Sequence, residues 1–525
     1  MTAVHSGPGT VQTIHGRDGI VASGHQFATD AALDVLRAGG NAVDAAIAGA
    51  FVLTVVCPYA VTLAGDAYLL IHDPKTGETT GVNGTGCAPR AATLDKFPER
   101  VAGEGPHAVT VPGLVAGLWD TWRQRGTRMW ASLIAPAEKL ARDGFEINAY
   151  FSQNLKNRAA LLAKDETAAA IYLPGGAPLP AGTFFRQPEI ADCLAMIAAD
   201  GAETFYRGEL AKRLCKAGDK IGWLIGPDDL AAHSTLIQRP VSVPFYGHDV
   251  WTMPPNSYGG TLLLQLLALE DARVADLDPD GVQFILRGLD ARRYAYRACA
   301  GHIADPGVVD EKFRALLNRT IRERTALRPA ASDPAEARDR CTTNICVIDR
   351  DGLAVSLIES ISAPCGSGVV LPGTGILLNN RLAGFNNDPA SPNCIAPGKR
   401  PAHTLAPSLV TKNGQILFSL GTPGTVGQTC SLAQYLARTL ACGQDVSTAA
   451  ARSRWSVDFA GKPVYENTMD KALAEKLTAL SPEFRPMPSG WISFGSIKLV
   501  RSDSGVQTGV ADYRRCATAG AVTFN

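Results

Sequence analysis

The 525-residue sequence predicts an α+β fold in which helices and strands are concentrated in different parts of the chain. Helical patterns are clearest over residues 127–235. Residues 320–341 are polar and rich in Ala and Pro without an apolar period, which is typical of a linker. From residue 342 onward, short β-rich segments separated by turn residues indicate mainly strands. The linker therefore marks the sharpest change of character in the chain.

Two helices are expected near the N-terminus. Thr29 or Asp30 can cap the first helix, because short polar side chains accept hydrogen bonds from the free N–H groups of a first turn. Gly39 and Gly40 can end that helix. Asn41 can cap the second helix.

The long uncharged segment 45–65 raises the question of a membrane span. Pro58 lies inside it, Asp44 and Asp66 flank it, and no basic residues orient it. The segment is interpreted as a buried helix that ends near Cys57, followed by a buried loop or strand. A membrane span is not expected.

The following elements are predicted from local patterns. Residues 67–86 read as a strand, a turn and a second strand. Residues 248–272 read as a short strand, a Pro/Gly loop and a helix that begins near Gly260. Beyond the linker, strand-like segments occur at 342–349, 353–362, 368–380 and 405–420.

Composition narrows the class of protein. Lys and Arg total 50 and Asp and Glu total 50, so the formal net charge is +0, which argues against a nucleic-acid binder or a polybasic membrane binder. The 12 cysteines include no CxxC pair and no zinc-like spacing, as expected for reduced thiols. The first residues show no apolar run after a basic segment. These features favour a cytoplasmic globular protein.

The segment "DRCTTNICVIDRDG" places a Thr-Thr pair at the start of an expected hairpin. An Asp-Gly turn at 351–352 pairs residues whose numbers sum to roughly 701–703. Thr342 then lies opposite residues 359–361, so Ser360 and Ser362 are expected beside it. The register alone gathers hydroxyl groups at one end of the hairpin.

The chain resembles the gamma-glutamyltranspeptidase family over nearly its whole length. The Thr-Thr start of the strand-rich half is similar to the start of that family's small subunit, and the earlier half is similar to its large subunit. The motifs that carry the resemblance are "GSGVVLPGTGILLNN" (366–380), "APGKRPAHTLAPSLV" (396–410), "GTPGTVGQ" (421–428), "AGGNAVDAAIA" (38–48), "VTVPGLVAGL" (109–118), "PPNSYGGTLLLQLL" (254–267) and "GDAYLLIHDP" (65–74).

This resemblance implies an N-terminal nucleophile hydrolase with a four-layer αββα sandwich. It implies that the precursor cuts itself between Cys341 and Thr342. Residues 1–341 would form a large subunit and residues 342–525 a small one, and together they would fill one αββα domain as a heterodimer. The resemblance implies no cofactor or metal, and whether the pair assembles further stays open.

The resemblance also implies roles for individual residues. Thr342 would be the nucleophile, and its freed α-amine, with an ordinary pKa of roughly 7.7–8.0, would be the base. Ser360 stands where the family has a second threonine that hydrogen-bonds the nucleophile. Gly424 and Thr425 would supply oxyanion N–H groups, with Thr425 in place of a second glycine. Asn344 stands where the family usually has His.

The family's clamp for an α-amino acid is largely missing. Gly384 replaces its acidic residue and Thr85 replaces its arginine. A Ser-Ser pair is replaced by His403 and Thr404, and an asparagine is replaced by Ser362. A buried ammonium without a carboxylate is costly, so a γ-glutamyl donor is disfavoured.

Arg381 is an arginine that the family's pattern does not have near these positions, and its guanidinium is well shaped to bind a carboxylate. With Arg381 and His403 present and the acidic residue absent, the pocket should prefer an anionic acyl group. A surface arginine, or one paired with Asp388, is the alternative. The short segment 385–401 predicts an open site that favours hydrolysis over transfer.

These observations favour a self-processing amidohydrolase for a small amide that carries a carboxylate, with oxamate the best single substrate. A gamma-glutamyltranspeptidase or glutathione hydrolase is the first alternative. A cephalosporin (glutaryl) acylase-like enzyme is a second, and a non-catalytic homologue that binds a small ligand is a third.

Overall fold

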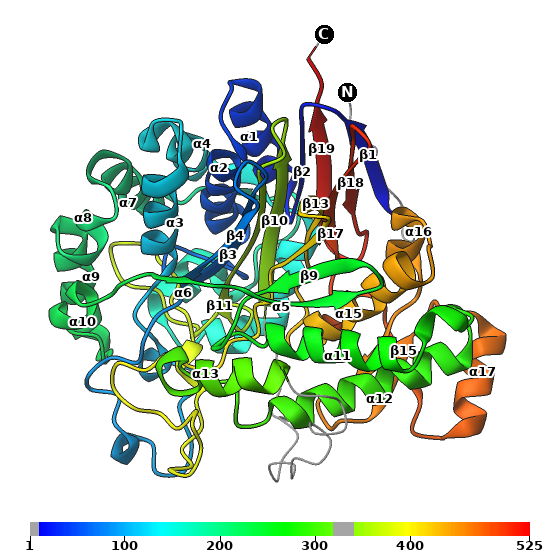
Figure 1. Ribbon diagram of the computed structural model, residues 1–525. Helices are drawn as coiled ribbons and strands as arrows, with labels where there is room; N and C mark the ends of the chain where they lie inside the picture. The colour runs from blue at the N-terminus through cyan, green and yellow to red at the C-terminus, as the bar shows by residue number, and fades with distance from the viewer. Residues whose placement is uncertain (1–9, 319–340, 525) are drawn as a thin grey trace.

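Two seven-stranded antiparallel sheets face each other at the centre of the computed structural model, which describes residues 10–318 and 341–524 (Figure 1). Sheet A has the order β1 (Gln12–Gly16), β18 (Val506–Ala511), β17 (Lys498–Asp503), β13 (Gln415–Gly421), β12 (Ser408–Lys412), β9 (His248–Thr252) and β8 (Val241–Phe245). Sheet B has the order β19 (Thr518–Val522), β2 (Gly19–Ser23), β10 (Cys341–Asp349), β11 (Ala354–Ser362), β3 (Asp66–Asp73), β4 (Glu78–Gly84) and β7 (Leu236–Gln238).

Helices cover the outer face of each sheet. The helices that lie between β2 and β8 in the chain are α1 (Gln26–Arg37), α2 (Ala42–Val56), α3 (Leu114–Arg125), α4 (Trp130–Asp143), α5 (Ala149–Leu162), α6 (Glu166–Tyr172), α7 (Pro188–Asp200), α8 (Glu203–Tyr206), α9 (Glu209–Ile221) and α10 (Pro227–Ala231). The later helices are α11 (Gly259–Asp271), α12 (Val282–Cys299), α13 (Pro306–Leu317), α15 (Gly427–Leu436), α16 (Val446–Ala451) and α17 (Lys471–Leu480). Short strands outside the main sheets are β5 (Phe145–Glu146), β6 (Phe184–Phe185), β14 (Trp455–Val457), β15 (Pro463–Glu466) and β16 (Arg485–Met487).

Three buried clusters define four layers. On one face of sheet B, alternate residues such as Leu69 and Val347 pack with the residues of α2. On its other face, residues such as Leu70 and Ile348 meet Leu409 of sheet A. The outer face of sheet A packs on α11, α12 and α15. Because side chains alternate across a strand, each sheet serves two cores, which confirms the predicted αββα sandwich.

Helix α2 shows why the long apolar segment stays inside the protein. All of its residues are buried, and it begins at Asn41 with a capping box to Asp44, as predicted. It ends with Cys57 as its C-cap, followed by a buried loop. No helix in the two described ranges is both long and apolar enough to cross a bilayer.

The start of α1 differs from the prediction. His25, not Thr29 or Asp30, caps this helix, because its Nδ1 accepts the Phe27 N–H at 3.3 Å. The Thr29 hydroxyl is used elsewhere, since it bonds the hydroxyls of Ser23 and Thr518 at 2.7 Å each. Tertiary contacts thus determine where the helix begins.

The predicted hairpin is confirmed. Asn344 pairs with Ile358 and Thr343 with Glu359, so the residue numbers sum to 702. The register shifts by one between Cys341 and Thr343, and Thr342 lies at this irregularity. The first residue beyond the predicted linker therefore lies in a local break of the strand ladder.

The prediction of a strand at 368–380 is wrong. Only an isolated bridge between Val370 and Leu377 occurs there. Gly368 (φ +79°), Gly373 (φ +74°) and Gly375 (φ +66°) adopt left-handed backbone conformations that interrupt an extended strand. The other strand, turn and helix predictions at 67–86, 248–272 and 405–420 agree with β3, β4, β9, α11, β12 and β13.

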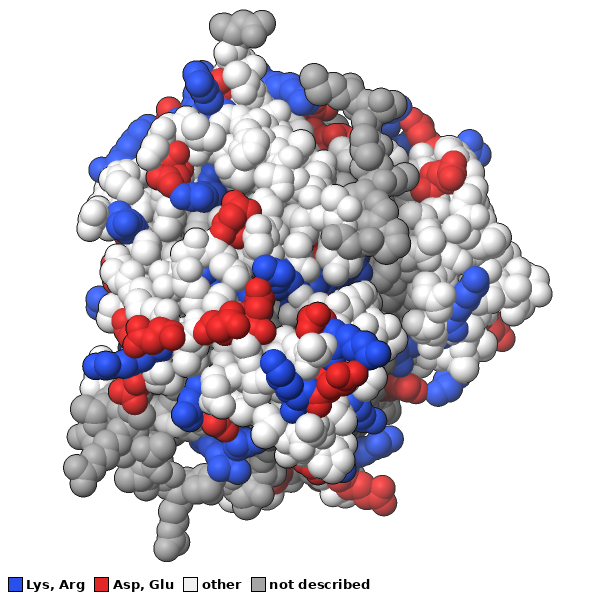
Figure 2. Space-filling view, turned by 90° about the vertical axis from the view of Figure 1, so that its right-hand side faces the viewer, with Lys and Arg blue, Asp and Glu red and all other residues white. Residues whose placement is uncertain are grey.

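Both sheets take strands from either side of the 341–342 bond. In sheet B, β10 lies between β2 and β11, and β19 pairs with β2. In sheet A, β1 pairs with β18 and β9 pairs with β12. The predicted linker 320–341 lies almost entirely outside the described residues. On the face shown in Figure 2, basic and acidic side chains are interspersed, as the zero net charge suggests.

Candidate active site

Thr342 is the second residue of β10, a strand whose residues are all buried. It is 3% exposed, and its Oγ has no hydrogen-bond partner among the described residues. The carbonyl oxygen of Cys341 accepts a hydrogen bond from the Ser360 hydroxyl at 2.6 Å. Ser360 thus polarises the carbonyl of the residue that immediately precedes Thr342.

Two donors in turn bond the Ser360 oxygen. The backbone N–H of Ser362 donates to it at 2.8 Å, and Nη2 of Arg381 donates to it at 3.2 Å. A hydroxyl that accepts from a cation becomes a stronger donor, because hydrogen bonds in a chain polarise one another. The predicted site residues Ser360, Ser362 and Arg381 are therefore connected to the Cys341 carbonyl.

The cation is held by a carboxylate that sequence reasoning did not select. Arg381 and Asp66 are both 0% exposed, and Nε of Arg381 bonds Oδ2 of Asp66 at 3.0 Å. Nε2 of His403 lies 3.2 Å from the same oxygen, and the Gly86 N–H donates to Oδ1 at 2.8 Å. Asp66 begins β3 and lies directly opposite Ser360 in the ladder.

The expectation that no carboxylate lies near Arg381 is wrong. The ion-pair partner of Arg381 is Asp66 rather than Asp388. Burial alone would raise the pKa of Asp66, but the His403 hydrogen bond and the Arg381 charge together lower it. Burial lowers the pKa of Arg381, and Asp66 opposes that shift. The signal in the sequence was a lone Asp between Gly65 and an apolar strand.

One polar atom of this cluster stays unused. Nη1 of Arg381 has no hydrogen-bond partner within the described ranges. The backbone of Arg381 is fixed, since its N–H donates to Oδ1 of Asn379 at 2.9 Å and the Asn379 amide donates to the carbonyls of Ala64 and Thr110. The guanidinium is therefore held in place, with one buried N–H₂ group that has no partner among the described residues.

The predicted oxyanion loop connects β13 to α15. Gly424 (φ +142°) and Thr425 (φ +57°) both have positive φ, and Thr425 is fully buried. No acceptor for the N–H of either residue occurs among the described residues. A Cβ on Gly421, just before the loop, would lie 2.9 Å from Nδ2 of Asn344. The loop therefore leaves β13 beside β10, two residues beyond Thr342.

Two positions of the missing amino-acid clamp have clear local reasons. At Gly384 a Cβ would lie 2.7 Å from the carbonyl oxygen of Ala402, so there is no room for an acidic side chain. Thr85 donates its hydroxyl to Oδ1 of Asn83 at 2.6 Å, and its carbonyl accepts from Nε of the buried Arg400 at 3.0 Å. Sequence reasoning missed Arg400. Thr404 is buried beside His403.

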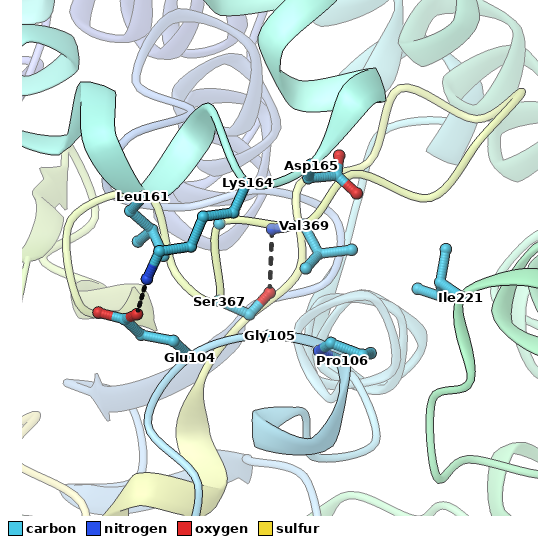
Figure 3. A pocket seen from close by; sticks show the side chains of 10 residues that line it. Glu104, Gly105, Pro106, Leu161, Lys164, Asp165, Ile221, Ser367 and Val369 are labelled. Atoms are coloured by element: carbon cyan, nitrogen blue, oxygen red, sulfur yellow. Dashed lines mark hydrogen bonds and ion pairs between the residues drawn. The ribbon is translucent and has the colours of Figure 1, made fainter.

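A cavity of about 740 Å³ lies next to this cluster. Its volume is within the usual range for small-molecule sites. Ala363, Asn380 and Phe385 line it; Ala363 follows Ser362 in the chain and Asn380 precedes Arg381. A second cavity of about 500 Å³, shown in Figure 3, is lined by Ser367, Val369 and the Lys164–Glu104 ion pair. None of the predicted site residues lines either of these two cavities.

The gamma-glutamyltranspeptidase family model matches residues 28–522. A glutathione hydrolase proenzyme of Escherichia coli strain K12 is 31% identical over 474 residues, covering 84% of this chain and 81% of that protein. An oxamate amidohydrolase proenzyme of Klebsiella pneumoniae is 33% identical over 455 residues, covering 83% of this chain and 84% of that protein.

Among solved structures, a cephalosporin acylase from Bacillus halodurans has a TM-score of 0.90 at 28% identity, covering 100% of both chains. The family match spans nearly the whole chain, and the fold agrees with it. The predicted family and fold are confirmed, and the chain belongs to the gamma-glutamyltranspeptidase family of amide hydrolases.

Proposed function

We propose that this protein is a self-processing amidohydrolase that cleaves the 341–342 bond and then hydrolyses a small amide bearing a carboxylate, with oxamate as the preferred substrate. The observation that carries the proposal is the pairing of an unbonded Thr342 hydroxyl with a Cys341 carbonyl held by Ser360. A nucleophile and a polarised carbonyl on adjacent residues are what an N→O acyl shift requires.

Cleavage would create the catalytic base. The freed α-amine of Thr342 would take the proton of its own Oγ, directly or through one water, as Oγ attacks the substrate amide. The amine or ammonia would leave, and water would hydrolyse the resulting ester. The N–H groups of Gly424 and Thr425 are available for the oxyanion, and losing one such donor typically costs about 3–4 kcal/mol.

The two products of cleavage would stay together. Because β10 lies between β2 and β11, and β1 pairs with β18, separating residues 1–341 from 342–525 would break both sheets. The proposed enzyme is therefore a heterodimer that forms one folded unit.

The preference for a carboxylate follows from the Asp66 cluster. Arg381 neutralises Asp66, and that carboxylate already accepts hydrogen bonds from Arg381 and Gly86, with His403 also in contact. Gly384, at the position of the family's acidic residue, has no side chain and so offers no carboxylate to a substrate ammonium. Nη1 of Arg381 is a buried donor that has no hydrogen-bond partner among the described residues, and a guanidinium N–H₂ group suits a carboxylate oxygen. The Klebsiella relative is named for oxamate, a small amide with one carboxylate.

Intact mass of the purified wild type beside Thr342→Ala tests the nucleophile. Two fragments meeting at Cys341/Thr342 in the wild type, and one chain in the variant, are expected. A single chain in both would favour a non-catalytic ligand-binding homologue instead.

A substrate panel then tests the specificity. Ammonia release from oxamate is expected to exceed hydrolysis of a γ-glutamyl anilide and of a glutaryl amide. Preference for the γ-glutamyl anilide would support the glutathione hydrolase alternative, and preference for the glutaryl amide would support the acylase alternative.

A further inference from the structure

Thr342 and a lysine both line a small cavity at the start of β10. The cavity measures about 20 Å³, which is room for about one water molecule. Lys498, the first residue of β17, lines it from the opposite sheet. The remaining lining residues are Gly24, Cys57, Tyr59, Ala60, Tyr150, Cys341, Thr343, Arg515 and Cys516.

Lys498 is buried, and no acidic side chain in the described part of the chain is ion-paired with it. It is 1% exposed. The acidic side chain whose charge acts on Lys498, Asp512, is bound instead by Arg454, by Arg514 and by the Ile497 N–H. A buried ammonium in this position is therefore poorly compensated.

The other titratable groups around Lys498 are a cation and neutral thiols or phenols. Arg515 carries a positive charge into the same cavity, while burial raises the pKa values of the cysteines and tyrosines that surround it. The groups that face Lys498 are Arg515, Asp512, Cys346, Cys57, Cys341, Cys516, Tyr59 and Tyr150. Burial first, and then Arg515, lowers the pKa of Lys498 to about 7. A large fraction of its side chain is thus a neutral amine near pH 7.

Self-cleavage requires a base other than the α-amine of Thr342, which would serve the mature enzyme. Before the 341–342 bond is cut, the nitrogen of Thr342 is an amide and accepts no proton. Building on the proposed self-processing function, we propose that Lys498 is the general base that activates Thr342 Oγ in the uncut precursor, directly or through one water in the shared cavity.

The proton balance closes on Lys498. Its neutral amine takes the Oγ proton as Oγ bonds to the carbonyl carbon of Cys341, and Ser360 stabilises the resulting oxyanion. The carbon–nitrogen bond then breaks, and the Lys498 ammonium returns the proton to the departing Thr342 nitrogen. Water hydrolyses the ester, which restores the Thr342 hydroxyl and leaves a carboxyl group on Cys341.

The role of Lys498 as a base determines how the rate of self-cleavage depends on pH. The base must be neutral, so the cleavage rate should rise with pH up to about 7 and level off above it. Below that pH, the rate should fall by about tenfold per unit, because the neutral fraction of a single base falls by that factor.

The experiment follows self-cleavage of freshly synthesised full-length chain by intact mass, from pH 5.5 to 9. Lys498→Met removes the base, and Lys498→Arg keeps a positive charge that does not deprotonate. Both variants are expected to cleave at least about 100-fold more slowly, the lower range for a general base. Lys412→Met is the matched control, since Lys412 is an exposed lysine on β12 of the same sheet, and wild-type kinetics are expected.

Near-UV circular dichroism reports whether each variant is folded. A folded Lys498→Met or Lys498→Arg chain that cleaves at the wild-type rate overturns the role of Lys498 while leaving Thr342 intact as nucleophile. If Lys498→Met does not fold, the wild-type profile decides, and a cleavage rate that is flat from pH 5.5 to 8 overturns the proposal. Cleavage of Thr342→Ala, or no cleavage of the wild type, overturns the proposed function itself.

Discussion

Replacing Ser360 with alanine tests how the Cys341 carbonyl is activated. The hydroxyl donates to that carbonyl at 2.6 Å and accepts hydrogen bonds from Ser362 at 2.8 Å and Arg381 at 3.2 Å. Loss of one oxyanion donor typically slows acyl transfer by about 10²–10³-fold, or about 3–4 kcal/mol. Ser360→Ala should therefore slow self-cleavage by about that factor.

Stability changes must be separated from this kinetic effect. Ser360→Ala also leaves the buried Ser362 N–H and one Arg381 N–H₂ group without an acceptor, at a cost of about 1–3 kcal/mol each. Ser356→Ala is the matched control: Ser356 lies on the same strand, is equally buried, donates to the Leu420 carbonyl at 2.8 Å and lies away from the 341–342 bond.

The assay is a time course of intact mass after synthesis of each full-length chain, with urea denaturation of the same variants in the Thr342→Ala background. Ser356→Ala should lose stability but cleave at the wild-type rate, and Ser360→Thr should restore most of the rate because it keeps the hydroxyl. If folded Ser360→Ala cleaves as fast as the wild type, the hydroxyl does not stabilise the oxyanion and the reasoning is refuted.

Three further predictions concern buried charge and backbone strain. Asp66→Asn leaves Arg381 unpaired and should lower the free energy of unfolding by about 3–5 kcal/mol in urea denaturation; an unchanged midpoint contradicts this. Glu359 is fully buried with neither carboxyl oxygen hydrogen-bonded to a described residue, and burial raises its pKa well above the ordinary value, so its native form retains a proton that the unfolded chain releases. Stability should therefore fall by up to about 1.4 kcal/mol per pH unit above pH 4.5, and Glu359→Gln should abolish that slope in urea denaturation at pH 5 and pH 8. Thr425→Gly relieves a left-handed conformation that costs a non-glycine residue about 1–2 kcal/mol and keeps the N–H, so amide hydrolysis should stay within about threefold of wild type, and a larger loss in a steady-state assay would show that the threonine side chain matters.

Local chemistry allowed much of the fold to be predicted from the sequence. The Asp-Gly turn determined the hairpin register, and the register brought Ser360 next to residue 341, because antiparallel pairing follows from the turn position. Asn41 capped α2 for an equally local reason. Local reasoning failed in two places. His25 replaced the predicted cap of α1 because tertiary contacts use the Thr29 hydroxyl, and left-handed glycines replaced the predicted strand at 368–380.

The sequence by itself determined the family, the layered fold and the position of Thr342, since these depend on motifs and on short-range pairing. Only the tertiary structure decided the electrostatics around that threonine. Asp66 lies 315 positions from Arg381 in the chain, and Lys498 comes from the other sheet, so no local pattern links either residue to the site. Charges act through space in a buried environment of low polarity, and for that reason Asp66 beside Arg381 became visible only once β3 was paired with β11, and Lys498 beside Thr342 only once the two sheets were stacked.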